Sequence, residues 1–172
     1  MEKKAKTILI VGAIAAAALV LTAALVLAPS EGPYSGPNSE YIGKYAEYNV
    51  SGVYGSTPYT GTFVIKVIGA SPDGIQVRYD LRINGTAINS SETAWIDVDE
   101  GSALSGMYRD SVPAYTSPLV VNGVPRSADV YIVPLGDIPS AEVWVVDDMV
   151  RKIVFTQDDA SVTCILTKTN IV

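Results

Sequence analysis

An unbroken run of uncharged, mostly apolar residues occupies positions 7–28, directly after the basic stretch that holds Lys3, Lys4 and Lys6. At about 1.5 Å of rise per residue, a helix of this length reaches roughly 33 Å and can cross the hydrocarbon core of a bilayer. The run therefore predicts one transmembrane helix. Because the lysines precede it, residues 1–6 are predicted to be a short cytoplasmic tail, and the rest of the chain to lie outside the cytoplasm.

The same run allows a second interpretation, a cleaved signal peptide, because it has a basic start and small residues near its end. Cleavage would then fall near Ala23 or Ala24. We favour a retained signal-anchor, since the apolar region of a signal peptide has only about 7 to 15 residues and since Pro29 directly follows Ala28. Both interpretations place the folded part outside the cytoplasm.

The pattern changes after the anchor. Residues 29–40 are rich in Pro, Gly and Ser and predict an extended linker. Residues 41–172 form one predicted β domain, whose clearest strand alternates apolar and polar residues from Ile75 to Ile83. The preceding run, residues 62–70, is joined to it through Ser71 to Gly74, which predicts a hairpin turn.

The C-terminal third continues in short β-branched runs that predict neighbouring hairpins, at residues 128–133, 142–146, 150–156 and 161–168. The predicted class is mainly β: an antiparallel sheet of about eight or nine strands, as a half-barrel or a sandwich, with one N-terminal transmembrane α-helix. Residues 92–97 and 141–147 resemble each other around Trp95 and Trp144, so an internal duplication is an alternative to independent strands.

Residues 141–155 place a strand with Trp144 and Asp147 before a turn and a basic strand that holds Arg151 and Lys152. This arrangement resembles an element of the lipoprotein-carrier-like half-barrel proteins of the LolA and LppX type. The resemblance is limited to the C-terminal third. It implies a curved antiparallel sheet around an apolar cavity and a role in moving or sensing lipids in the cell envelope, although the soluble carriers have a cleaved signal where this chain has an anchor.

Composition and charge exclude several classes of function. The formal net charge is −6, and an acidic surface repels nucleic acid, so no nucleic-acid partner is expected. The chain has no histidine and one cysteine, Cys164, which excludes histidine-based catalytic triads and metal sites as well as CxxC redox chemistry. Because its neighbours are mostly apolar, Cys164 is expected to be a buried thiol.

Carboxylate clusters are the remaining chemical candidates: Asp97, Asp99 and Glu100, then Asp147 and Asp148, then Asp158 and Asp159. Each cluster lies where a strand is expected to end, and aspartate is favoured in turns because its side chain bonds its own backbone. We interpret all three as turn residues rather than as Ca²⁺ ligands or a glycosidase pair. No catalytic, metal or cofactor site is predicted, and the chain is not expected to be an enzyme.

Two sets of residues are candidate surface sites. Asn-x-Ser/Thr triplets make Asn49, Asn84 and Asn89 candidate N-glycosylation acceptors in an extracytoplasmic domain. The second set is a cluster of candidate interface aromatics, Tyr34, Tyr41, Tyr45, Tyr48, Tyr54 and Tyr59. Alternatively, these amphipathic rings lie near the membrane surface or on the outer face of a strand.

Together these patterns favour a non-catalytic, single-pass membrane protein that is a structural or accessory component of a cell-envelope or membrane assembly. Its predicted partners are membrane lipid, through residues 7–28, and another protein of the membrane or envelope. The alternative is a binding module or carrier that holds a lipid or another apolar ligand in a curved β-sheet.

Overall fold

The computed structural model describes Gly36 and residues 38–54, 56–86, 89–97, 112–135, 138–147, 149–157 and 160–170. The predicted tail, transmembrane helix and most of the linker lie outside these residues. Within the described ranges, no helix combines the length and apolar character that a membrane span requires.

The described residues are almost entirely β. Their elements are η1 (Ser39–Tyr41), β1 (Tyr45–Tyr54), β2 (Thr57–Ser71), β3 (Gly74–Ile83), β4 (Asn89–Asp97), β5 (Tyr115–Val121), β6 (Val124–Leu135), β7 (Ile138–Val146), β8 (Met149–Gln157) and β9 (Ala160–Thr169). These elements confirm the mainly β class and the expected antiparallel pairing, with a strand count inside the predicted range.

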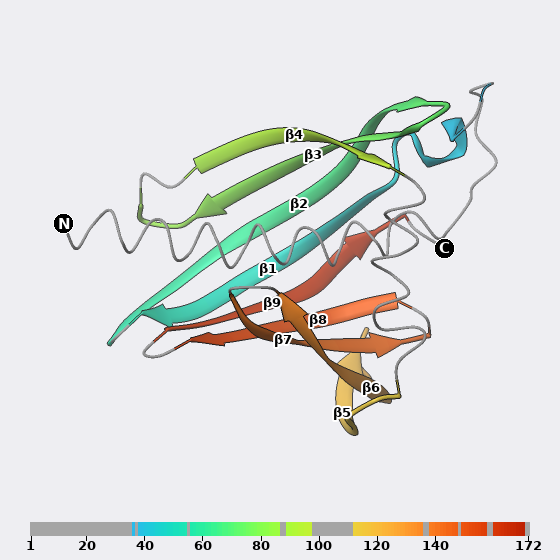
Figure 1. Cartoon of the computed structure of the whole chain (residues 1–172). Coiled ribbons are helices and arrows are strands. Elements are labelled where there is room, and N and C mark those ends of the chain that lie inside the picture. Colours follow the sequence, from blue (N-terminus) through green and yellow to red (C-terminus); the bar gives the residue numbers. More distant parts are fainter. Residues whose placement is uncertain are drawn as a thin grey trace.

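The nine strands of the described residues form one open sheet, in the order β4-β3-β2-β1-β9-β8-β7-β6-β5. The first and last strands are therefore neighbours at its centre, while β4 and β5 form its edges. Figure 1 shows the strong twist of this sheet, from β4 at the top to β5 and β6, which stand steeply beside β7. Twist of this kind follows from the right-handed preference of L-residue strands.

The predicted hairpin between residues 62–70 and 75–83 is confirmed. Ser71 pairs with Gly74 across the turn, and Phe63 faces Leu81 farther along. β2 is longer than its apolar pattern because its polar first residues pair with β1, up to Thr57 opposite Tyr54. Pairing with a neighbour, rather than side-chain alternation, sets the start of this strand.

One face of the sheet carries the hydrophobic core. Directly opposed residues share a face, and a single row of such residues runs across four strands through Val50, Cys164, Ile153 and Val143. All four are at most 1% exposed. The row continues on the other side of β1 through Gly61 on β2. We call this side of the sheet the apolar face.

The two tryptophans lie in different surroundings in the sheet. Trp95 lies on the edge strand β4 and is 59% exposed. Trp144 lies on β7, between β6 and β8, with the Lys152 ammonium 3.8 Å from the centre of its ring. Only Trp95 is therefore available at an edge of the described sheet.

The start of β1 is tied to the end of β9 by Asn170. Its side-chain oxygen accepts a hydrogen bond of 2.8 Å from the Tyr45 backbone N–H, and its side-chain nitrogen donates one of 3.1 Å to the Gly43 carbonyl. The buried Lys44 side chain lies beside these bonds, with Nζ 3.5 Å from the Asn170 carbonyl oxygen. The entry of the chain into the domain is thus held against its C-terminal strand.

Candidate functional site

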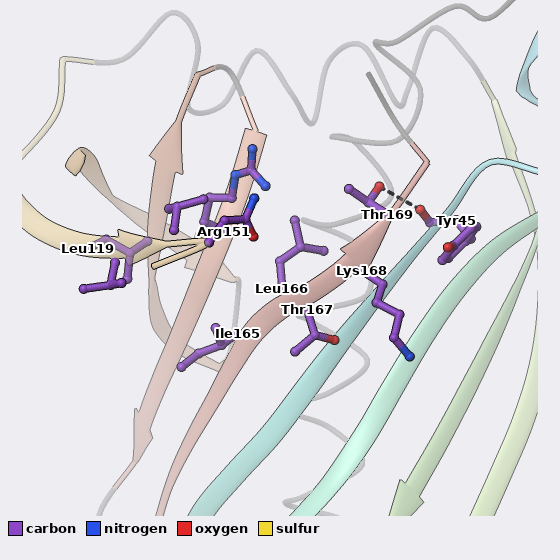
Figure 2. Close-up of a pocket in the computed structure, with 11 residues that line it drawn as sticks. Tyr45, Leu119, Arg151, Ile165, Leu166, Thr167, Lys168 and Thr169 are labelled. Atoms are coloured by element: carbon purple, nitrogen blue, oxygen red, sulfur yellow. Dashed lines mark hydrogen bonds between the residues drawn. The ribbon is translucent and has the colours of Figure 1, made fainter. Parts of the chain in front are cut away.

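A pocket of about 400 Å³ opens where the end of β5 approaches the end of β9. Its lining comes from four strands and the β5–β6 turn: Tyr45, Leu119, Val120, Val121, Asn122, Arg151, Ile165, Leu166, Thr167, Lys168 and Thr169. Figure 2 shows Arg151 between Leu119 on β5 and Leu166 on β9. This volume is within the range of small-molecule sites in proteins.

Two irregularities in the sheet shape this pocket. The β7–β8 register passes from Trp144 opposite Lys152 to Val145 opposite Val150, so Arg151 is an extra residue in its strand. The β1–β9 register shifts in the same way and leaves Thr167 extra. Bulges bend a strand and re-aim side chains, and both bulged residues line the pocket. The pocket is therefore a consequence of local strand geometry.

Polar contacts hold the β9 wall of the pocket against β1. Thr169 Oγ1 donates to the Tyr45 carbonyl at 2.8 Å, the bond drawn in Figure 2. Thr167 Oγ1 donates in the same way to the Glu47 carbonyl at 3.0 Å. The Lys168 ammonium forms an ion pair with Glu47 at 3.2 Å. This wall is thus fixed, and the Lys168 charge already has a counterion.

Arg151 differs from Lys168 because no described residue forms an ion pair with it. Among the described residues it makes no ion pair, and its Nε atom is buried without a hydrogen-bond partner. None of the described residues that line the pocket is acidic. A guanidinium carries fixed donors that match a carboxylate or phosphate, so the arrangement is suited to anion binding.

The predicted tyrosine cluster is divided by the fold. Tyr41, Tyr45 and Tyr59 are half-buried, and Tyr45 lines the pocket. Tyr48 is only 2% exposed, with its hydroxyl 3.4 Å from the Val150 carbonyl. Tyr48 is therefore a core residue and not an interface aromatic. The reason is its register, which places it opposite Phe63 on the apolar face. Tyr34 and the side chain of Tyr54 lie outside the part of the chain that the structure describes.

All three glycosylation candidates are exposed. Asn49 lies on β1, Asn84 follows β3 in the turn, and Asn89 begins the edge strand β4. The Asn84 amide also donates to Thr60 Oγ1 at 3.0 Å. Exposure makes each asparagine sterically available, and their modification stays a prediction.

The carboxylate clusters fall at strand ends as far as they are described. Asp147 occupies the two-residue turn between β7 and β8, where Val146 pairs with Met149, and it has a positive φ of 52°. Asp97 is the last residue of β4. Asp99, Glu100, Asp148, Asp158 and Asp159 lie outside the described residues. In the described part of the chain, no three His, Cys, Asp or Glu side chains are grouped to hold a metal ion.

Cys164 is buried, as predicted from its neighbours, and burial raises the pKa of its thiol from 9.0 to about 12. Below pH 9 the thiol is protonated in both the folded and the unfolded chain. Between pH 9 and 12 the unfolded chain releases this proton while the folded chain keeps it, so folding stability falls as pH rises, by about 1.4 kcal/mol per pH unit for this group.

We therefore expect the urea midpoint of the full chain to drop between pH 9 and 11, and Cys164→Ala to reduce that pH dependence. Part of the pH dependence should remain, because the pKa of Tyr59 is also raised, from 10.0 to about 12. Burial is the larger cause of that rise, and the charge of the nearby Cys164 is the smaller one. A slope identical in the Cys164→Ala variant would show that the thiol is accessible in the folded state.

Sequence reasoning missed Arg151 as a site residue and did not identify the β5–β6 hairpin that forms one wall of the pocket. A signal for the hairpin exists, since Asn122 and Gly123 have positive φ values of 52° and 79° and stand between Val121 and Val124. Asn-Gly between β-branched residues favours a two-residue hairpin turn. No comparable signal marks a bulge at Arg151.

Comparison with known proteins adds little to this description. No protein-family model matches the chain, and no curated protein is detectably similar to it in sequence. Among solved structures, the chain is similar to a DUF1329 family protein from Desulfovibrio piger, with 10% sequence identity over 91% of this chain and 92% of that one, and a TM-score of 0.28. So remote a likeness supports no functional inference, and the resemblance to lipoprotein carriers stays a prediction.

Proposed function

We propose that the protein is a non-catalytic accessory component of a cell-envelope or membrane assembly, anchored by residues 7–28 with its β domain outside the cytoplasm. The sequence supports the anchor through the length of the apolar run and the lysines before it. The domain would then act beside the membrane by binding another protein.

The edge strand β4 carries this proposal. Among the described strands it is the last on its side of the sheet, and Trp95 on it is 59% exposed. An edge strand offers backbone groups for pairing with a further strand, and an exposed tryptophan offers a large contact area. Proteins use this combination when a partner adds a strand to a sheet. The opposite edge strand, β5, is less suited to pairing with a further strand, because Pro118 has no backbone N–H to donate.

Packing on the apolar face favours this role over that of an internal lipid carrier. Phe63, Ile65 and Ile75 are at most 1% exposed. A curved-sheet carrier needs large apolar side chains that line an open space, and the largest ones here are already buried. A ligand carrier would therefore have to hold its ligand away from these closely packed side chains.

Native mass spectrometry of the full chain, purified in detergent from its own membrane, tests this proposal. We expect a protein partner in stoichiometric amount, and we expect Trp95→Ser to lose it because the centre of the contact is removed. The matched control is Val53→Ser, which removes a 38% exposed apolar side chain from β1, in the middle of the sheet. A partner that survives Trp95→Ser, or a retained lipid with no protein, would refute the proposal.

A further inference from the structure

We propose that the pocket between β5 and β9 binds a small organic monoanion with an apolar body, such as a short alkyl carboxylate, through Arg151. This site is separate from the β4 edge and does not depend on the anchoring role. The proposal rests on the charge, the shape and the lining of the pocket.

The charge of the pocket matches one negative group. Lys168 is neutralised by Glu47 at 3.2 Å, whereas Arg151 has no ion pair among the described residues. Because no described residue of the pocket lining is acidic, the Arg151 guanidinium leaves one positive charge there without a counterion in the described part of the chain. A carboxylate supplies one negative charge and accepts two parallel hydrogen bonds from a guanidinium. A phosphate dianion would leave excess negative charge.

Internal hydrogen bonds do not explain the place of Arg151. Nε is buried and unpartnered, which is costly for a charged donor and rare in a purely structural arginine. The β-bulge inserts this residue beside the end of β9 that pairs with β1 but not with β8, since the β8–β9 ladder begins only at Lys152 and Ile165. The regular pairing of β8 is thus interrupted at Arg151, whose guanidinium reaches the pocket.

Apolar side chains lie on both sides of Arg151. Leu119 and Val121 from β5 form one wall, and Leu166 from β9 forms the other. Figure 2 shows the arginine side chain between Leu119 and Leu166. An anion held by the guanidinium would therefore place its attached chain against leucine and valine side chains, and its affinity would increase with the apolar area buried.

Isothermal titration of the full chain in zwitterionic nanodiscs tests the proposal, with empty nanodiscs as the blank. Hexanoate is the ligand, acetate has the charge without the apolar body, and hexanol has the apolar body without the charge. We expect hexanoate to bind at least tenfold more tightly than acetate or hexanol. The proposal would be overturned if either hexanol or acetate bound as tightly as hexanoate.

Three variants locate the site. We expect Arg151→Gln to weaken hexanoate binding about tenfold or more, because a charge-assisted hydrogen-bonded pair is lost. Leu119→Ser should weaken it by a smaller factor while it leaves acetate unchanged. The matched control is Lys66→Gln, which removes one charge from an exposed position on β2 that does not line the pocket.

Urea midpoints of all variants are measured in parallel. If Arg151→Gln does not fold, the wall variant Leu119→Ser still tests the same pocket. Hexanoate affinity that is unchanged in Leu119→Ser, or that falls equally in Arg151→Gln and Lys66→Gln, would show that the anion binds elsewhere or only through net charge.

Discussion

Gly52→Ala should destabilise the protein by about 2 to 4 kcal/mol, although alanine is normally favoured over glycine within a strand by about 0.5 to 1 kcal/mol. The Tyr59 ring passes over Gly52, and its hydroxyl donates to the Ser161 carbonyl at 3.1 Å, which joins β2 to β9 across β1. A Cβ atom at Gly52 would collide with both the Tyr59 ring and the Ser161 carbonyl. Either the hydrogen bond breaks or the strands move apart.

Urea unfolding of the full chain measures this effect. Gly69→Ala is the matched control, because the nearest atoms to its added Cβ belong to the flexible Gln76 side chain, at 3.2 Å and beyond. We expect that control to change stability by less than about 0.5 kcal/mol. Equal losses in the two variants would mean that Tyr59 does not cross at Gly52.

Ile153→Ala should lower the free energy of unfolding by about 2 to 5 kcal/mol, the usual cost of truncating a buried isoleucine. Ile153 is 0% exposed and stands in the row between Cys164 and Val143. Its core is shared by the β1–β4 and β6–β9 halves, because buried residues of both belong to one cluster. The loss should therefore appear as one shifted transition rather than as partial unfolding.

Ile68→Ala removes the same atoms from a position on β2 that is 39% exposed, at the β2–β3 bulge, and should cost less than about 1 kcal/mol. Circular dichroism at increasing urea follows both variants. If Ile153→Ala unfolded in two separate transitions and only one of them were shifted, that result would contradict a single core.

The locally encoded parts of the fold were predictable. Residues 75–83 alternate because one side of β3 packs in the core and the other meets water, and Ser71 to Gly74 turn because they contain Pro, Asp and Gly. The four C-terminal runs became β6 to β9 with longer ends. By contrast, β1 shows a weaker alternation that mixes Tyr, Asn, Ser and Gly, so its role at the centre of the sheet was not visible.

The candidate site was not predictable for a related reason. Arg151 lies in an ordinary basic strand sequence, and a bulge arises only when the strand meets a particular neighbour in a particular register. Lys168 looks equivalent to Arg151 in the sequence, yet Glu47 from a strand 121 positions away neutralises it. The difference between a free and a paired cation is thus a property of the assembled sheet.

By itself, the sequence determined the class of the fold, the main hairpins and the burial of Cys164, because these depend on residue type and on neighbours a few positions away. Only the tertiary structure decided that β1 pairs with β9, that Tyr48 belongs to the core, and that two bulges open a pocket beside β5. The physical reason is that strand alternation specifies which face is apolar but not which distant strand will pair with it.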